Sequence, residues 1–259
     1  MPHDGSAQDT DQIPTNMRLL LLLEEVARSG EPVTPTEVNS HLGLPKPTVH
    51  RLFRRLEEEG FVERDLDGRS YSAGERLRRM SADALSSRQI RMTRSIILKK
   101  LAGEIGETCN ISVPDRDDMV YIDRVETKWP LRIQLPTGAR VPFHCSASGK
   151  MYLASLNPRM FRTYVANADL TSYTIRTKTD PDALSEEIRQ IRGQGYATED
   201  QEFLEGMAAI AVPLQAGSGR LLSALTIHAP VQRQQLSDLI KHLPQMKEAA
   251  ERLRALVVN

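Results

Sequence analysis

The chain has few of the residues and runs that define several protein classes. Only two cysteines, Cys109 and Cys145, occur in 259 residues, which excludes a disulfide-stapled domain and favours a reducing compartment. Its leucine run, residues 19–23, ends at Glu24 and is far shorter than the ~20 apolar residues that a membrane-spanning helix needs. No small-residue cleavage site follows the run, so it does not fit a signal peptide. We therefore expect a soluble, cytoplasmic protein with no membrane partner.

The sequence also lacks net charge, since 34 Lys and Arg residues balance 34 Asp and Glu residues. The charges are unevenly distributed. Residues 1–75 carry 8 basic and 14 acidic side chains, whereas residues 76–100 carry 8 basic side chains and one acid, Asp83. Any nucleic-acid interface must therefore be a local basic patch. The length of 259 residues suits two domains.

The first segments predict a helix-turn-helix. Residues 1–14 are small, polar and acidic, as in a disordered tail. A helix over residues 17–29 is apolar around most of its circumference, which favours a role as core and dimer interface. A second helix begins with the capping box Thr34-Pro35-Thr36-Glu37 and ends at Gly43. A third begins at Pro47, and two short helices joined by a tight turn containing glycine are typical of a helix-turn-helix.

The third helix, residues 47–59, separates apolar and basic side chains. Its apolar residues follow the i, i+3, i+4, i+7 pattern of a core-facing stripe: Val49, Leu52, Phe53 and Leu56. The opposite face has no carboxylate before Glu57 and carries six polar or basic residues: Lys46, Thr48, His50, Arg51, Arg54 and Arg55. A solvated helix face is the plainer interpretation, but this helix is the one that enters the DNA groove in a helix-turn-helix.

Two short strands, residues 61–64 and 69–72, flank Asp67-Gly68, which is a strong hairpin signal and predicts a wing. Arg69 and Tyr71 lie near its tip, where a wing meets phosphate or the minor groove. The predicted DNA-binding residues are Thr34, Lys46, Thr48, His50, Arg51, Arg54, Arg55, Arg69 and Tyr71.

Beyond residue 88 the pattern favours an α+β fold with a central antiparallel sheet, because strands in hairpins alternate with flanking helices. The predicted strands are residues 108–113, 119–124, 131–135, 207–214 and 221–228. The predicted helices are residues 148–156, a capped helix from residue 180 to near 193, and residues 232–257.

Motifs that resemble catalytic or metal-binding sites lack the residues or the spacing that such sites need. Ser148-Gly149-Lys150 imitates the end of a phosphate-binding loop, but His144 stands where that loop needs glycine. His144 and Cys145 are adjacent, and neighbours on an extended segment point to opposite sides. The histidines and cysteines show no zinc-type spacing. We therefore expect no catalytic residue, no metal site and no cofactor.

The chain resembles the IclR family of bacterial transcriptional regulators, and the resemblance covers almost all of it. It is carried by three groups of motifs: residues 34–62 of the helix-turn-helix, Pro142-Phe143-His144-Cys145-Ser146-Ala147-Ser148-Gly149-Lys150, and Gly193-Gln194-Gly195-Tyr196-Ala197 with Gly206-Met207-Ala208-Ala209-Ile210-Ala211-Val212-Pro213. Pro47 departs from the family, which often has a hydroxyl residue there.

The resemblance implies a domain order. It places a winged helix-turn-helix over residues 15–74, a linker helix over residues 75–87 and a GAF-like effector-binding domain over residues 88–259. A plain surface helix remains the alternative for the linker. The implied partners are double-stranded operator DNA, a small organic acid effector and a second copy of the chain, as a homodimer or dimer of dimers. Repression is the expected mode.

The resemblance also implies an effector site. By position, the polar contacts of the family's acid-binding members fall on Ala147, Ser148, Glu199, Asp200, Ala209, Thr226 and His228. The apolar walls fall on Ile133, Val141 and Met207. Three of these residues, Ala209, Thr226 and His228, differ from those in the best-known acid sensors, so the identity of the ligand does not transfer.

Two alternatives remain open at this point. A protein partner instead of a metabolite would also control a DNA-binding regulator. An enzyme built on a GAF-like pocket would need a paired nucleophile and base, which the sequence does not show. The start of the helix near Ser148 offers backbone N–H groups to an anion, although a close-packed helix start is the competing interpretation.

Overall fold

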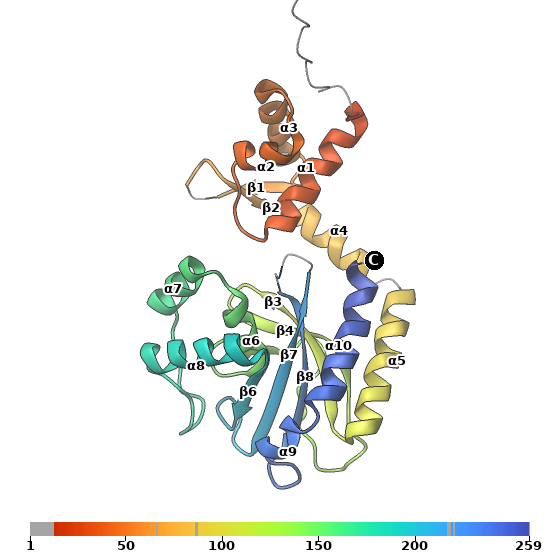
Figure 1. The fold of residues 1–259 in the computed structure, drawn as a ribbon, viewed down its shortest axis with the longest axis vertical. Coiled ribbons are helices and arrows are strands. Elements are labelled where there is room, and N and C mark those ends of the chain that lie inside the picture. Colours follow the sequence, from red (N-terminus) through yellow and green to blue (C-terminus); the bar gives the residue numbers. More distant parts are fainter. Residues whose placement is uncertain (1–12, 66, 86–87, 217–218, 220, 259) are drawn as a thin grey trace, which may run out of the picture. The chain divides into compact units, whose positions relative to one another are not determined.

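The computed structural model describes residues 13–65, 67–85, 88–216, 219 and 221–258, and it divides into two units, Met1–Ser87 and Arg88–Asn259 (Figure 1). The predicted disordered tail lies almost entirely outside the described residues. Each unit has a hydrophobic core of its own.

The first unit is a helix-turn-helix followed by a two-stranded wing. Its elements are α1 (Thr15–Ser29), α2 (Pro35–Leu42), α3 (Lys46–Glu58), β1 (Val62–Arg64), β2 (Tyr71–Ala73) and α4 (Glu75–Leu85). The predicted capping box is confirmed, because the Thr34 hydroxyl accepts from the Glu37 N–H at 3.3 Å and the Thr34 N–H donates to the Glu37 carboxylate at 2.7 Å. Gly43 ends α2 in the left-handed conformation, with φ of 62°.

The second unit is built on one antiparallel sheet, as predicted. Its strands are β3 (Thr108–Asp115), β4 (Asp118–Val125), β5 (Arg140–Pro142), β6 (Ala197–Asp200), β7 (Met207–Gln215) and β8 (Leu221–Pro230), in the order β5-β4-β3-β8-β7-β6. Its helices are α5 (Arg88–Ile105), α6 (Ala147–Ser155), α7 (Pro158–Asn167), α8 (Pro181–Gln194), α9 (Leu236–Ile240) and α10 (Leu243–Val258). Helices cover both faces of the sheet (Figure 1).

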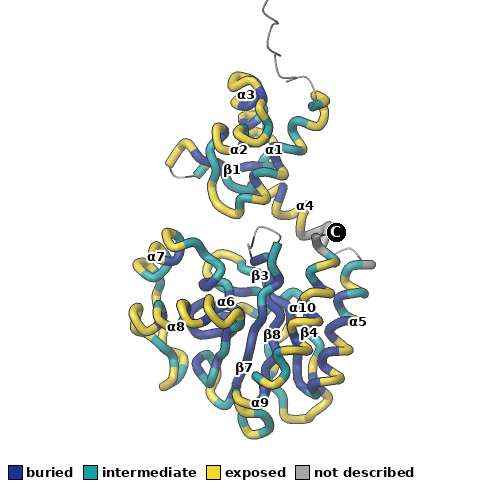
Figure 2. The backbone as a smooth tube through the Cα atoms, in the orientation of Figure 1, coloured by how far each residue is buried: buried dark blue, intermediate teal, exposed yellow. Residues whose placement is uncertain are grey.

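The two faces of the sheet differ in chemistry. Helices α5 and α10 pack on one face over an aliphatic core that includes Ile111, Ile210 and Leu225. Helix α6 packs on the other face, with α8 against it. The strands β7 and β8 are buried along most of their length (Figure 2). Because successive strand residues point to opposite faces, the residues between these aliphatic positions face α6.

The predicted strand over residues 131–135 is wrong. That segment is irregular, and its backbone oxygens accept from arginine side chains instead of from a neighbouring strand. The Arg124 guanidinium donates to the Ile133 carbonyl, and Arg233 donates to the Leu131 carbonyl at 2.9 Å. The flanking prolines, Pro130 and Pro136, lack the N–H that a ladder needs.

Other boundaries also differ from the sequence prediction. Helix α8 runs on to Gln194 and ends at Gly195, which has φ of 75°, instead of near residue 193. The predicted C-terminal helix is divided into α9 and α10. The short elements β5, β6 and α7 were not predicted. The strands β5 and β6 are too short for an alternating pattern to stand out, and no Asp-Gly or Asn-Gly turn flanks them as Asp67-Gly68 flanks the wing strands.

Gly149 in α6 has no room for a side chain. A Cβ at this position would lie 2.4 Å from the Phe143 Cα and 2.5 Å from its carbonyl oxygen. We expect Gly149→Ala to lower the free energy of unfolding of the second unit by about 1–3 kcal/mol or more, because the backbone must move. Gly103 in α5 has open space around its Cα, so Gly103→Ala should stabilise by up to about 1 kcal/mol. Denaturant unfolding of both variants is the measurement, and equal stability of the two would contradict the packing.

Candidate DNA-binding surface and effector site

The outer face of α3 presents basic side chains to solvent. Five residues of the predicted set are exposed there: Lys46, His50, Arg51, Arg54 and Arg55. All of them except Arg55 lack an ion-pair partner among the described residues. Thr48 is half-buried at the start of the helix, while Val49, Phe53 and Leu56 are buried on the inner face. The predicted division between a basic face and an apolar face therefore exists in the structure.

Two residues of the predicted set, Thr34 and Arg55, already bind other side chains of the first unit. Arg55 pairs with Glu59 at 2.8 Å and approaches Glu58 at 3.6 Å. The Thr34 hydroxyl donates to Glu37 at 2.8 Å and accepts from the Glu37 N–H. DNA binding by either residue would compete with these contacts, so Arg51 and Arg54 are the better-placed cations.

The wing presents Arg69 on an ordered turn. The Asp67 carboxylate accepts from the N–H groups of Arg69 and Ser70 at 2.7 and 2.8 Å and from the Ser70 hydroxyl at 2.6 Å. These Ser70 and Arg69 hydrogen bonds lower the pKa of Asp67 to about 2. Gly68 has φ of 66°, which glycine adopts without strain. Arg69 is exposed at this tip.

Tyr71 is a correction to the predicted set. Its side chain is buried in the core of the first unit, with its ring 4.9 Å from that of Phe53. The Arg64 guanidinium covers the ring at 4.9 Å. Alternation along β2 turns Tyr71 inward, so its ring holds the wing against α3 instead of facing DNA.

In the second unit, the strand register brings most of the predicted effector residues onto the face under α6. His228 pairs with Ala209, and Ala209 pairs with Glu199, so these three form one row across β8, β7 and β6. Thr226 stands two residues along β8 on the same face and pairs with Asn110 of β3. All five side chains are buried. Together these five side chains mark the α6 side of the sheet, which we call the sensor face.

The first turn of α6 lies over the sensor face. Ala147 and Ser148 are buried there as the first two residues of α6, whose backbone N–H groups have no acceptor within the helix itself. The Ser146 hydroxyl caps the helix by accepting from the Gly149 N–H at 3.1 Å. Gly149 is therefore closely packed, while the N–H groups of the two residues before it, Ala147 and Ser148, have no acceptor within the helix.

The apolar residues of the predicted site are placed unevenly. Val141 of β5 and Met207 at the start of β7 are buried. Ile133 is half-buried in the irregular segment and contributes its carbonyl to Arg124. Asp200 does not join the site, because alternation along β6 turns it to the face opposite Glu199. Its carboxylate pairs with Arg176 at 2.6 Å instead.

Sequence reasoning missed Asn110, Ser112 and Arg124, which also lie on the sensor face. The Arg124 side chain is 4% exposed and reaches His228, with 3.4 Å between a guanidinium nitrogen and Nε2. Asn110 and Ser112 belong to a polar series at every second position of β3 that begins at Thr108. That alternation was present in the sequence and would have indicated a buried polar face.

The sensor face holds several polar atoms without partners. The Nδ2 and Oδ1 of Asn110, the hydroxyls of Ser112 and Thr226, the Nδ1 of His228 and the Oε2 of Glu199 are buried with no hydrogen-bond partner in the part of the chain that the structure describes. Unpaired buried polar atoms cost free energy, commonly 1–3 kcal/mol each. A face that carries six of them is suited to a polar ligand.

His228 is neutral on this face. Burial, together with the nearby positive charge of Arg124, lowers its pKa to about 3. Because an arginine only donates hydrogen bonds, the Nε2 of His228 must accept from Arg124. The proton of the neutral ring is therefore on Nδ1, which we assign as a buried, unpaired donor.

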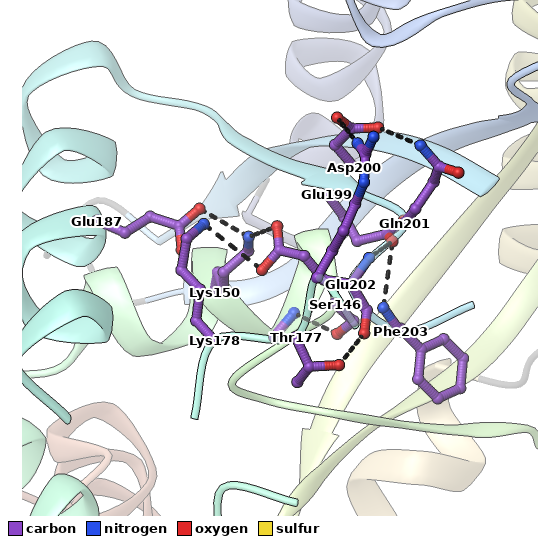
Figure 3. A network of polar contacts seen from close by, with 12 residues as sticks. Ser146, Lys150, Thr177, Lys178, Glu187, Glu199, Asp200, Gln201, Glu202 and Phe203 are labelled. Carbon is purple, nitrogen blue, oxygen red and sulfur yellow. Dashed lines mark hydrogen bonds and ion pairs between the residues drawn. The ribbon is translucent and has the colours of Figure 1, made fainter. Parts of the chain in front are cut away.

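A buried ion-pair network lies close to Glu199 of the sensor face (Figure 3). The Lys150 ammonium is fully buried and donates to Glu187 of α8 at 2.7 Å and to Glu202 at 2.6 Å. Lys178 joins the network, 3.0 Å from Glu187. Burial opposes the charged ammonium, but Glu202 and Glu187 outweigh it and hold the pKa of Lys150 above its ordinary value. Lys150 is thus structural, in agreement with the rejection of a phosphate-binding loop.

His144 and Cys145 do not form a nucleophilic pair. The His144 ring lies 2.9 Å from the Thr171 carbonyl, and Cys145 is buried, with its pKa raised to about 12 by that burial. The thiol therefore stays protonated at neutral pH. Within the described ranges no three His, Cys, Asp or Glu side chains gather as a metal site would require. No helix there is long and apolar enough to cross a bilayer.

These features define the class. The first unit is a winged helix-turn-helix with a basic outer helix face, and the second is an antiparallel sheet with a buried polar face. Residues 17–66 match the IclR helix-turn-helix domain, and residues 82–255 match the family described as bacterial transcriptional regulator IclR C-terminal. The chain belongs to the IclR family of bacterial transcriptional regulators, whose members are not enzymes.

Individual relatives agree with this assignment. The transcriptional regulator SauR of Cupriavidus necator is 35% identical over 237 residues, which cover 92% of this chain and 94% of SauR. The transcriptional repressor IclR of Escherichia coli is 31% identical and is matched over 90% of this chain and 85% of its own length. An IclR homologue from Microbacterium hydrocarbonoxydans, crystallised with 4-hydroxybenzoate, shares the fold at 21% identity, with a TM-score of 0.59 and coverage of 92% of this chain and 98% of that one.

The Lys150 network gives a stability prediction. Lys150→Met should lower the free energy of unfolding by about 3–5 kcal/mol, because it leaves buried Glu202 and the largely buried Glu187 without their shared cation. Lys178→Met removes a more exposed cation from the same network and should cost less than about 1 kcal/mol. Urea unfolding of the two variants is the measurement. Equal losses would show that Lys150 is not the central cation.

Proposed function

We propose that this regulator represses transcription by binding operator DNA through α3 and the wing, and that a small organic acid at the sensor face alters operator binding. The observation that supports the acid most directly is the set of buried, unpaired polar atoms beside Arg124. The proposed domain limits are residues 15–74 for DNA binding, 75–87 for the linker helix and 88–259 for the sensor. We place the protein in the cytoplasm, where its DNA is.

The chemistry of the sensor face favours an anion. The first turn of α6 offers the N–H groups of Ala147 and Ser148, and His228 offers an Nδ1–H. Arg124 adds a buried cation, which also pairs with Glu126 at 3.3 Å. Carboxylate oxygens accept from all of these donors. Asp200, which would have repelled an anion, faces away. The relative crystallised with 4-hydroxybenzoate supports a carboxylate ligand, and the repressor among the relatives supports repression.

We also propose that the protein acts as a dimer or a dimer of dimers. A single helix-turn-helix contacts too few base pairs for specific recognition in a genome. Met17 and Leu20 are exposed apolar side chains on α1, and Leu20 is 55% exposed. This apolar edge supports pairing of two copies through α1.

Operator binding should depend on Arg51 and Arg69 in different ways. With an operator selected in vitro by the wild type, Arg51→Ala should cost about 1–3 kcal/mol and relax specificity at one base pair, as expected for a base contact. Arg69→Ala should weaken all duplexes alike and lower the slope of log affinity against log salt by about 1, as expected for a phosphate contact. The exposed Arg162 of α7 is the control, since Arg162→Ala should change neither quantity. Fluorescence anisotropy at several salt concentrations measures both.

The acid site can be tested with acetate, glycolate, lactate, pyruvate, benzoate and 4-hydroxybenzoate, each against its amide. An acid that binds only the folded protein should raise the melting temperature of the full chain, by an amount that grows with the logarithm of its concentration above Kd, whereas the amide should not. Ala147→Trp should abolish the shift by filling the space beside α6 while operator affinity is retained, because the first unit has a separate core. Ala166→Trp, at an exposed position of α7, is the matched control. Undiminished binding by Ala147→Trp would place the site elsewhere.

A further inference from the structure

Glu199 is held in an unusual state for a carboxylate. Its side chain is fully buried, and one oxygen, Oε1, accepts from the N–H groups of Glu202 and Phe203 at 2.7 and 3.2 Å. The other oxygen, Oε2, is buried with no partner among the described residues. Glu199 therefore has one fully used oxygen and one unused oxygen on the sensor face.

The neighbouring charges leave no cation for Glu199. Lys150, whose positive charge acts on Glu199, is bound to Glu187 and Glu202 at 2.7 and 2.6 Å. Lys178 contacts the same two carboxylates at 3.0 and 3.7 Å. Two cations and two anions already balance in this network (Figure 3). A negative charge on Glu199 would be a third, uncompensated anion in a buried place.

The other titratable groups that face Glu199 keep their protonation states near neutral pH. His228 of β8, in the same row, is neutral because its pKa is lowered to about 3, and Cys145, before α6, stays a thiol because its pKa is raised to about 12. Burial raises the pKa of Tyr121 of β4, so its phenol is neutral as well. Arg124 of β4 lies 3.4 Å from the Nε2 of His228.

We infer that Glu199 is a neutral carboxylic acid that binds the effector through its Oε2–H, donating a hydrogen bond to an acceptor oxygen of the ligand. This inference rests on the proposed effector site. It makes Glu199 a donor, like the Nδ1–H of His228 and the N–H groups of Ala147 and Ser148. A site composed of donors selects a carboxylate, a keto acid or another ligand rich in acceptors, and it disfavours an ammonium group at the same place.

Effector affinity should depend on pH through the protonation of Glu199. Burial raises the pKa of Glu199 to about 8, with the backbone N–H bonds and Lys150 opposing it. If only the protonated form binds an anion, affinity is constant well below that pKa and falls as pH rises through it. With one proton linked to binding, raising the pH from 7 to 9 weakens binding about tenfold. An ionised Glu199 that accepted from the ligand would give the opposite sign.

The first test needs no ligand. Infrared spectra of the full chain should show a C=O stretch of a protonated carboxyl group at pH 7 that is missing from the Glu199→Gln variant and lost from the wild type by pH 10. Glutamine keeps an oxygen for the two N–H groups of residues 202 and 203 and places an N–H where Oε2–H stood, so the variant should fold. A wild-type spectrum at pH 7 identical to that of the variant overturns the inference.

The second test uses the acid of the panel that raises the melting temperature most. Calorimetry should show about tenfold weaker binding by the wild type at pH 9 than at pH 7, while Glu199→Gln binds within about twofold of the wild-type pH 7 value at both. Glu205→Gln, an exposed carboxylate on the same loop, should keep the wild-type pH dependence. Glu199→Leu, which removes the donor, should bind at least about tenfold more weakly at pH 7.

The outcomes separate the two proposals. If acids bind the wild type but Glu199→Gln shows the same loss between pH 7 and pH 9, Glu199 is not the linked group and this inference alone is overturned. If no acid of the panel binds the wild type, the proposed effector class fails, and the donor role of Glu199 fails with it.

Discussion

A buried ammonium has to be compensated by carboxylates, and in the second unit this constraint sets the positions of three elements. Lys150 of α6 is compensated by Glu187 of α8 and by Glu202 of the loop after β6. Because the ammonium is fully buried, none of these elements can move away without leaving a charge unpaired. The arrangement fixes the height of α6 above the sheet, and with it the place of the N–H groups of Ala147 and Ser148.

The same network determines the protonation state of Glu199. Its Oε1 holds the N–H groups of residues 202 and 203, so the loop that supplies Glu202 to Lys150 also binds Glu199. The network is neutral without Glu199, and the low dielectric of the interior makes an additional charge expensive. Structure and electrostatics thus lead to the same result. A residue that appears acidic in the sequence acts as a hydrogen-bond donor in the fold.

The two units differ in how far the sequence predicts them. The helix-turn-helix is specified by local signals such as the capping box at Thr34 and the glycine at position 43, each of which acts within a few residues. The sensor face depends on register between strands far apart in the chain, as in the pairing of Asn110 with Thr226. Glu199 and Asp200 could not be separated while β6 went unrecognised, although alternation then places them on opposite faces. Tyr71 was misplaced although its strand was predicted, because the sequence does not show which face of the wing packs on α3.

Occupancy of the sensor face has a physical route to the surrounding structure. The hydroxyls of Thr174 and Thr177 donate to the carbonyls of Gln201 and Glu202 at 2.6 Å, so the segment before α8 is fastened to the same loop that Glu199 holds by its N–H groups. A ligand that draws on the Oε2–H of Glu199 makes Oε1 a stronger acceptor, because hydrogen bonds in series polarise one another. It therefore tightens the loop and the segment together. An effector that bound only to Arg124 and α6 would leave that loop unaffected. Contact with Glu199, rather than occupancy alone, therefore changes the stability of this half of the sensor unit.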